Sequence, residues 1–475
     1  MDGLECSEIL LSDTNNLDND WFRLDSHFYE KKYIKLKQKL EDMPHWYMKE
    51  IVEKTIQTGH TPSMKNESFY GGTIPLIKTD NLRENFITDT FSDYLSEQGN
   101  AEIERTSLQE DDIITTIIGA TEDVIARSAL VLKEFLPANI NQNIVQIRIN
   151  RRIVPPAFVN AYINSCYGRN YLRYLSRQTE QVNLNCKEIE NVLVPMFSES
   201  LYTLIDDCTK LAHSRQQQSR AAFYDAQEIL QRKLGFYENE EKNSISVLDF
   251  SKSFKRFGRL DAEYYQPKYD VYIHMLHTAD TVNSLCNIYD KNYIPENEFL
   301  YKYIELANVG LSGEISNVEY VKGSELPTRA RRRVRAGQVI VSSVEGSLQS
   351  CALITDKFDG ALCSTGFYVL TSDTINSETL LVLFKSEVMQ ALLKQRCSGT
   401  ILAAITKDDL LSMPLPKIDD SIQAEIAGKV QMSFSLRRQS AQLLEYAKRA
   451  VEMAIEQGEN AALAWLNSKV SNAEV

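Results

Sequence analysis

The chain contains an internal duplication, which constrains its fold more than any other feature. Residues 23–29 read RLDSHFY and return at residues 259–265 as RLDAEYY, an offset of 236 in a chain of 475 residues. Each copy is followed by similar strand and helix patterns in the same order. Two like halves can present two like surfaces related by an approximate two-fold axis. Such symmetry suits a two-fold partner, of which duplex DNA is the commonest.

Each half carries a run of β-branched residues that ends at a glycine. Residues 111–119 and 338–346 are such runs, closed by Gly119 and Gly346, and they predict a buried strand followed by a turn. Further strands are expected at residues 71–77, 143–149, 303–309 and 367–370. The alternation within 143–149 predicts a half-exposed strand.

A long helical segment follows an apolar stretch with a closing proline in each half. These helices are expected at about residues 198–234, with Gly235 as the C-terminal cap, and about 421–457. Each would be roughly 50 Å long at ~1.5 Å per residue. Long helices with narrow apolar stripes need a helical partner, and two-fold symmetry would make the pair antiparallel. The alternative is that each helix packs only on its own domain.

The expected fold class is therefore α+β. Two similar globular α/β domains are separated by two long helices that form an antiparallel coiled coil with pseudo-two-fold symmetry. The expected boundaries are a first domain at 1–197, a first spacer helix at 198–236, a second domain at 237–417, a second spacer helix at 418–460 and a C-terminal tail at 461–475.

Composition and missing motifs argue for a binding protein. There is no apolar run long enough to span a membrane and no signal-peptide pattern at the N-terminus, so we expect a cytoplasmic protein. Eight cysteines occur singly, which predicts no zinc site and no disulfide framework. Phosphate-binding and methyltransferase motifs are lacking, so we expect no catalytic residues, no metal site and no cofactor in this chain. The net charge of −13 excludes a simple histone-like DNA binder but not a local basic face.

The first candidate DNA-binding group is a set of arginines spaced by four: Arg169, Arg173 and Arg177. A helix would place all three on one face, with Tyr167, Tyr171 and Tyr174 interleaved. Such a ridge could contact successive phosphates or a guanine edge. The alternative is a solvated helix face that pairs with nearby acids.

The densest basic run of the chain is the second candidate. It holds Arg329, Arg331, Arg332, Arg333 and Arg335. Five arginines in seven residues repel one another unless an anion is nearby. The run leads into the strand that ends at Gly346, so a folded domain is expected to present it to DNA. A contact with an acidic protein surface is the alternative.

The turns that follow the glycine-ended strands form the third candidate. Thr121 and Arg127 follow the first turn, and Ser347 and Gln349 follow the second. Short polar side chains on such a loop can enter a groove and read base edges, although ordinary hairpin chemistry also explains the glycines. Lys78, directly after the first expected strand, is a further candidate.

Taken in order, these segments resemble the DNA-specificity subunits of type I restriction-modification systems. The resemblance covers nearly the whole chain. It rests on the Arg-Leu-Asp segments at 23 and 259, the strands ending at Gly119 and Gly346, the Asn-Gln-Asn step at 141–143, the proline closures at 195 and 414–416, and the long helix after each closure.

The resemblance implies two target-recognition domains, each reading half of a split double-stranded DNA sequence, and a helical ruler between them. It also implies two methyltransferase subunits that bind S-adenosylmethionine, and two motor-nuclease subunits that use ATP and magnesium if the system restricts DNA. The specificity subunit itself is not an enzyme. Two alternatives remain: a coiled-coil scaffold joining two protein partners, and the recognition subunit of another DNA-modification defence system.

Overall fold

The computed structural model describes residues 26–88, 90–119, 124–178, 182–235, 247–251, 253–254, 258–316, 318–399 and 403–473. The Arg-Leu-Asp segment at 23–25 and Thr121 lie outside these residues. The chain divides into two compact units. Unit 1 comprises Met1–Arg215 and Arg438–Val475, and unit 2 comprises Gln216–Arg437.

Unit 1 is built on two principal sheets, of which one is antiparallel throughout and the other contains a parallel pair. The antiparallel sheet has the order β2 (Gln57–Thr58), β11 (Ile144–Ile147), β7 (Ile113–Thr116) and β9 (Ser128–Leu130). The other has the order β10 (Asn139–Ile140), β3 (Tyr70–Ile77) and β6 (Tyr94–Leu95), with β10 parallel to β3. Both sheets hold apolar β-branched residues at their centres, as the strand predictions require.

Smaller strand pairs and short helices complete unit 1. The strands are β1 (His45–Tyr47) with β14 (Leu193–Pro195), β4 (Leu82–Arg83) with β5 (Phe86–Ile87), and β12 (Arg177–Gln178) with β13 (Val182–Asn183) and β8 (Ile118–Gly119). The helices are α1 (Lys31–Glu41), α2 (Met48–Ile51), α3 (Glu97–Glu102), α4 (Pro156–Asn164), α5 (Cys166–Leu175) and α6 (Cys186–Glu190).

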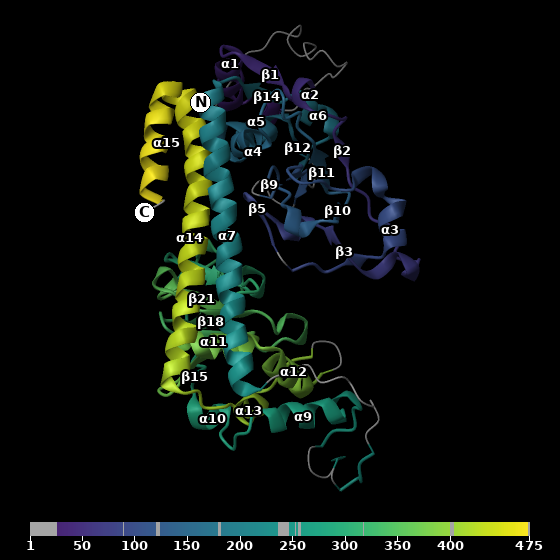
Figure 1. The fold of residues 1–475 in the computed structure, drawn as a ribbon, viewed down its shortest axis with the longest axis vertical. Helices are drawn as coiled ribbons and strands as arrows, with labels where there is room; N and C mark the ends of the chain where they lie inside the picture. Colours follow the sequence, from purple (N-terminus) through teal and green to yellow (C-terminus); the bar gives the residue numbers. More distant parts are fainter. Residues whose placement is uncertain are drawn as a thin grey trace. The chain divides into compact units, whose positions relative to one another are not determined.

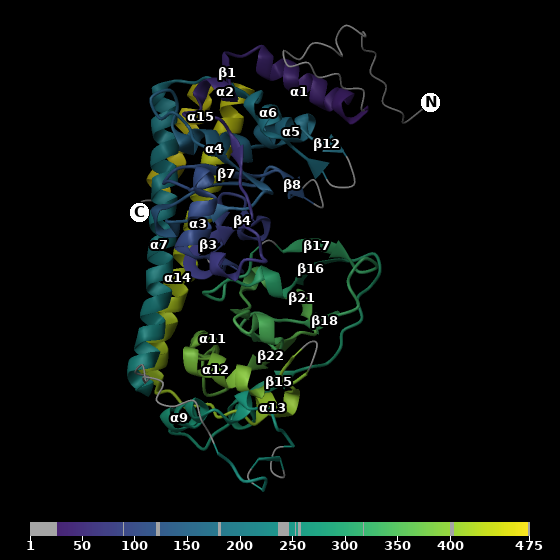
Figure 2. The same cartoon turned by 90° about the vertical axis from the view of Figure 1, so that its right-hand side faces the viewer.

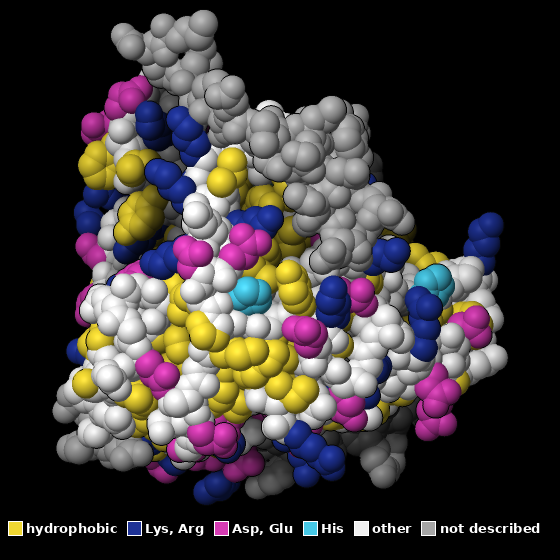
Figure 3. All heavy atoms as spheres, turned by 90° about the horizontal axis from the view of Figure 1, so that it is seen from above, with side chains coloured by type: hydrophobic (Ala, Val, Ile, Leu, Met, Phe, Trp, Pro, Cys, Tyr) yellow, Lys and Arg dark blue, Asp and Glu magenta, His cyan; other side chains and the backbone are white. Residues whose placement is uncertain are grey.

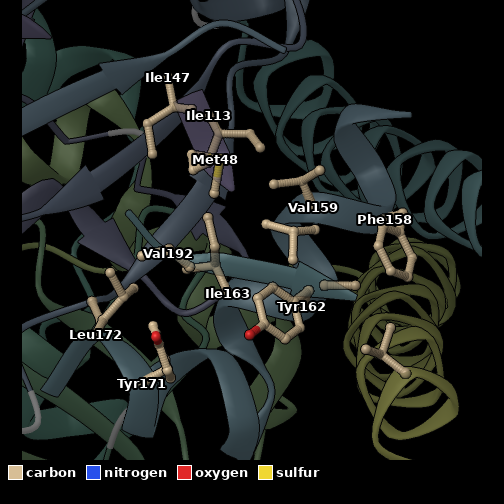
Figure 4. Close-up of a cluster of buried hydrophobic side chains, with 14 of the residues drawn as sticks. Met48, Ile113, Ile147, Phe158, Val159, Tyr162, Ile163, Tyr171, Leu172 and Val192 are labelled. Atoms are coloured by element: carbon tan, nitrogen blue, oxygen red, sulfur yellow. The ribbon is translucent and has the colours of Figure 1, made fainter. Parts of the chain in front are cut away.

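The core of unit 1 forms around α4, all nine residues of which are buried. Figure 4 shows Phe158, Tyr162 and Ile163 of this helix among side chains from α5 and the sheet strands. The hydroxyl of Tyr162 donates a hydrogen bond to the carbonyl oxygen of Leu193 at 2.6 Å, which satisfies the polar atom of this buried side chain. Burial raises the pKa of Tyr162.

Unit 2 repeats this architecture with two four-stranded sheets (Figure 2). One has the order β15 (Asn287–Tyr289), β22 (Phe367–Thr371), β19 (Val339–Ser342) and β20 (Cys351–Leu353). The other has the order β17 (Glu319–Lys322), β16 (Leu300–Ile304), β21 (Leu362–Ser364) and β18 (Ala330–Arg333). Its helices are α9 (Pro267–Met275), α10 (Val282–Leu285), α11 (Ser377–Lys385), α12 (Glu387–Arg396) and α13 (Lys407–Leu411).

Strand pairing confirms that the units are copies of one design. Thr116 pairs with Ile144 in unit 1, and Ser342 pairs with Phe367 in unit 2, both in antiparallel ladders between equivalent strands. The parallel pair β3–β10 likewise returns as β16–β21. The duplication predicted from sequence is therefore a duplication of topology as well.

Four strand predictions need correction. The runs 111–119 and 338–346 were expected to be strands that end at their glycines, but β7 ends at Thr116 with Gly119 in the separate strand β8, and β19 ends at Ser342 with Gly346 in a short 3-10 helix. Residues 143–149 were expected to be half exposed, but all four residues of β11 are buried. Gln146 is the reason, because its amide Nε2 donates to buried Asp112 at 2.5 Å. The strand expected at 303–309 instead ends at Ile304, because Asn308 Oδ1 accepts from the Glu305 amide at 2.7 Å and closes a turn.

Two long helices, α7 (Glu199–Leu234) and α14 (Asp420–Gln457), lie side by side (Figure 1). In unit 1, Cys208 Sγ donates to the carbonyl oxygen of Leu443 at 3.3 Å. In unit 2, Ser219 Oγ donates to the carbonyl oxygen of Ser433 at 2.8 Å, and Asp225 pairs with Lys429 at 2.6 Å. Partner numbers fall as α7 numbers rise, so the predicted antiparallel pairing is confirmed. Gly235, with φ +68°, follows α7 as predicted.

The segment expected as a C-terminal tail from residue 461 is helical instead. Helix α14 ends at Gln457, Gly458 adopts φ +92°, and α15 (Glu459–Ala473) follows. Ala462 and Leu466 of α15 are fully buried, and the ring centroids of Trp465 and Tyr446 lie 5.6 Å apart. Among the described helices, none is long and apolar enough to cross a membrane.

Candidate nucleic-acid interface

The predicted arginine ridge of unit 1 does not lie on one helix. Ser165 caps α5 by accepting from the Gly168 amide at 3.2 Å, so the helix restarts where the sequence indicated. It ends at Leu175, because Ser176 turns to an extended conformation and donates its hydroxyl to the carbonyl oxygen of Arg173 at 2.7 Å. Arg177 therefore belongs to β12, and the prediction of three arginines on one helix face is wrong.

The tyrosines between these arginines are not a surface row. Tyr171 and Tyr174 are buried, and Tyr174 stacks on Phe28 with ring centroids 4.2 Å apart. Tyr167 differs from these two, because its hydroxyl accepts a hydrogen bond from Lys39 Nζ at 3.0 Å at the surface. Two of the three rings therefore stabilise the core of unit 1.

Arg169 is engaged inside unit 1. Its Nη1 lies 3.1 Å from Glu84 Oε2, and Lys448 Nζ of α14 lies 2.9 Å from Glu84 Oε1. Burial raises the pKa of Glu84, but Arg169 and Lys448 outweigh it and hold that pKa below its usual value. Arg169 thus serves an ion-pair cluster, and its contact with DNA stays a prediction.

We expect Arg169→Ala to lower the free energy of unfolding of unit 1 by about 1–2 kcal/mol, between the values for surface and buried ion pairs. The reason is that Glu84 would keep only one cationic partner. All three tryptophans, Trp21, Trp46 and Trp465, belong to unit 1, so urea unfolding followed by tryptophan fluorescence reports on this unit. Arg151→Ala, which removes an exposed pair with Asp111, is the matched control and should change little. Equal losses in both variants would contradict the assignment.

Arg177 lies on the same small sheet as Gly119. It pairs with Asn183 across β12 and β13, and β13 in turn pairs with Gly119 in β8. Its Nε lies 3.0 Å from Glu188 Oε1, yet its side chain is 52% exposed. The structure therefore brings this arginine and Gly119 onto one small sheet.

The remaining unit 1 candidates lie in different surroundings. Arg127 and Arg173 are half-buried, and Lys78 is ion-paired with Asp93. Arg83, which the sequence did not single out, donates from Nη1 to the carbonyl oxygen of Asp80 at 2.6 Å. Burial and then the charge of Arg127 lower its pKa.

In unit 2 the arginine run lies on and beside the edge strand β18, and each arginine has a local partner. Arg329 lies 3.8 Å from Glu305, and Arg335 lies 3.3 Å from Asp359. Arg331 Nε donates to the Thr328 carbonyl oxygen at 2.9 Å, and Arg332 donates to that of Asp290. Arg333 lies over the ring of Tyr293 at 5.0 Å. The repulsion expected within the run is thus relieved inside unit 2, although Arg329 and Arg335 stay more than half exposed.

The turn after β19 presents the other unit 2 candidates. Ser347 Oγ lies 3.2 Å from Ser342 Oγ, within the turn. Gln349 is exposed, and its backbone carbonyl oxygen accepts from Lys385 Nζ at 2.7 Å. The backbone is thereby fixed while the Gln349 side chain stays available, an arrangement suited to reading base edges.

Charge is mixed on the face of the molecule in Figure 3, where Lys and Arg side chains are interspersed with Asp and Glu. No three His, Cys, Asp or Glu side chains come together as a possible metal site among the described residues. No broad basic field is visible on the part of this face that the structure describes.

The fold defines a class of protein: a duplicated α/β unit with an antiparallel pair of long helices. The sequence resemblance is to the specificity subunits of type I restriction-modification systems. The resemblance to that class is confirmed by a curated relative, the type I restriction enzyme EcoBI specificity subunit of Escherichia coli. The two are 24% identical over 123 residues, which cover 26% of this chain and 25% of that protein. The matched stretch thus spans about a quarter of the relative's length. No family model matches the chain.

Solved structures with similar chains carry related descriptions. The HsdS subunit from Thermoanaerobacter tengcongensis is 16% identical, with 87% of this chain and 96% of that chain covered and a TM-score of 0.30. The type I restriction-modification S subunit from M. genitalium is 11% identical, with 89% and 95% covered and a TM-score of 0.33. A chain from a study of assembly and conformational transition of the type I R-M system is 16% identical, with 89% and 98% covered and a TM-score of 0.28.

Proposed function

We propose that this chain is the DNA-specificity subunit of a type I restriction-modification system. It binds double-stranded DNA at a bipartite sequence, and each unit reads one half. The observation that supports the proposal is the repeated α/β unit, in which Gly119 follows the buried strand β7 and Gly346 follows the buried strand β19, with polar or basic residues beside each. Helices α7 and α14 each continue from one unit into the other, which suits a spacer between two readers.

The chemistry of the system belongs to other chains. The proposed partners are two methyltransferase subunits, which supply S-adenosylmethionine chemistry, and two motor-nuclease subunits with ATP and magnesium where the system restricts DNA. This chain takes no catalytic role and works in the cytoplasm. Mixed charge on its surface is consistent with protein partners that cover part of it.

Selection from a random double-stranded DNA library tests the proposal. The full chain is used alone and together with any methyltransferase that co-purifies with it. The expected product is a motif of two fixed half-sites separated by a constant number of unspecified base pairs. A single undivided motif, or no enrichment in either preparation, would refute the proposal. Capture of a protein partner without any DNA enrichment would instead favour the scaffold alternative.

A further inference from the structure

A short hairpin occurs at the same place in both units. In unit 1 it is β4–β5, with Leu82 opposite Ile87. In unit 2, Val309 and Ile315 form the equivalent bridge. An asparagine turn precedes each hairpin: Asn81 Oδ1 accepts from the Lys78 amide at 2.9 Å, and Asn308 Oδ1 accepts from the Glu305 amide at 2.7 Å.

A glutamate in each hairpin loop contacts a cation of α14. Glu84 lies 2.9 Å from Lys448 in unit 1, and Glu314 lies 2.6 Å from Arg437 in unit 2. The two cations are mostly buried, with side chains 16% and 22% exposed. Burial raises the pKa of Glu314, but Arg437, a backbone hydrogen bond and Lys385 together outweigh it, so that pKa also lies below its usual value. Both glutamates are therefore ionised partners of α14 at neutral pH.

The opposite side of each hairpin is connected by hydrogen bonds to a segment that follows Gly119 in unit 1 or Gly346 in unit 2. In unit 1, Asn164 Nδ2 donates to Asn85 Oδ1 at 2.8 Å and to the Ser128 carbonyl oxygen at 3.0 Å. In unit 2, Lys385 Nζ donates to the carbonyl oxygens of Gly310 at 2.9 Å and Gln349 at 2.7 Å. Asn164 and Lys385 hold equivalent positions, at the last residue of α4 and of α11.

Each unit thus contains a continuous path of contacts, which we call a hairpin link. It runs from α14 through the hairpin glutamate and the donor at the end of α4 or α11 to Ser128 in unit 1 and to Gln349 in unit 2. The links use different residues, Glu84 with Asn164 and Glu314 with Lys385, to make the same connection. Lys385 is buried with two carbonyl acceptors, and Glu314 lies close enough to interact with its charge.

We infer that these hairpin links are positioning devices. Glu84 and Asn164 hold Ser128 of unit 1, and Glu314 and Lys385 hold residues 347–351 of unit 2, at a fixed place on the part of the helix pair that belongs to the same unit. The inference rests on the proposed function and deepens it, because the number of base pairs between half-sites then depends on the links as well as on helix length.

The test compares the full chain with its Glu84→Gln and Glu314→Gln variants in the random-duplex selection. The preparation used, the chain alone or with its methyltransferase, is the one in which the wild type enriches a DNA motif. Each variant should keep both half-site sequences but accept several spacer lengths in place of one. Glu298→Gln, which removes an 87% exposed partner of Lys322, is the matched control and should keep one length. A merely structural role would lower the melting temperature and leave spacer length unchanged, and that outcome would overturn the inference.

Amide hydrogen exchange supplies a readout that needs no DNA. In Glu314→Gln, exchange at residues 347–351 should rise at least about tenfold, the factor for losing one charge-assisted hydrogen bond. Exchange in α12 should stay unchanged. Unaltered exchange at 347–351 would also overturn the inference. If the wild type selects no bipartite motif while this exchange rises, the proposed function fails and the mechanical link stands.

Discussion

Inserting seven residues into both long helices will lengthen the spacer of the recognised DNA sequence by about three base pairs. The insertions go into α7 between Cys208 and Ser219 and into α14 between Ser433 and Leu443. Seven helical residues add ~10 Å at ~1.5 Å each, and base pairs are ~3.4 Å apart along the duplex. The half-site sequences should not change, because the recognition turns are untouched. Random-duplex selection with the full chain measures both properties.

The antiparallel register explains why both helices must change. Cys208 contacts Leu443, and Ser219 contacts Ser433, so an insertion in α7 alone would shift one apolar stripe against the other. That single insertion is the control, and we expect it to destabilise the chain without giving a new, unique spacer. Altered half-site sequences, or an unchanged spacer after the paired insertion, would contradict the idea that the helices measure distance.

The long helices and the duplication could be predicted because each produces a pattern that is visible in a short stretch of sequence. Leu201, Ile205, Cys208 and Ala212 recur at helical spacing, and all four are fully buried. The β-branched runs are equally local, since they form the buried strands β7 and β19, although neither strand extends to its glycine. The pairing of the two long helices, more than 200 residues apart, was predicted from the symmetry of the duplication and not from any feature of the two helix sequences.

The candidate site was less predictable because its contacts join residues that are distant in sequence. Arg169 pairs with Glu84, 85 positions away, and no local pattern reveals that pairing. The i, i+4 spacing of the arginines indicated one helix face, but the Ser176 hydroxyl ends the helix first. Arg83, Glu84 and Lys385 were not singled out from the sequence, because none of them belongs to a recognisable local sequence pattern.

The two copies also show how one structural task is met by different chemistry. In unit 1, Asp112 Oδ2 accepts from the Gln109 amide at 2.8 Å. In unit 2, Gln338 Oε1 accepts from the Arg335 amide at 2.7 Å. Each acceptor lies three residues beyond its donor, directly before the central strand. The aspartate, however, also carries a charge, which must be balanced inside unit 1.

Arg148 supplies that balance, and loss of the Asp112–Arg148 ion pair should give the largest stability change. Its Nε and Nη2 lie 2.7 and 2.8 Å from the two oxygens of Asp112, whose side chain is 1% exposed. We expect Asp112→Ala to cost about 3–5 kcal/mol, because it leaves a mostly buried guanidinium without its anion. Urea unfolding of the full chain, followed by tryptophan fluorescence and circular dichroism, measures this.

Gln338→Ala is the matched control for that substitution. It removes the equivalent turn-closing acceptor without stranding a charge, so it should cost only about 1 kcal/mol, the net value of one hydrogen bond. The difference between the variants isolates the ion pair from the turn. If both lose the same stability, the turn rather than the Asp112–Arg148 pair is what holds the start of β7 in place, and the electrostatic explanation is wrong.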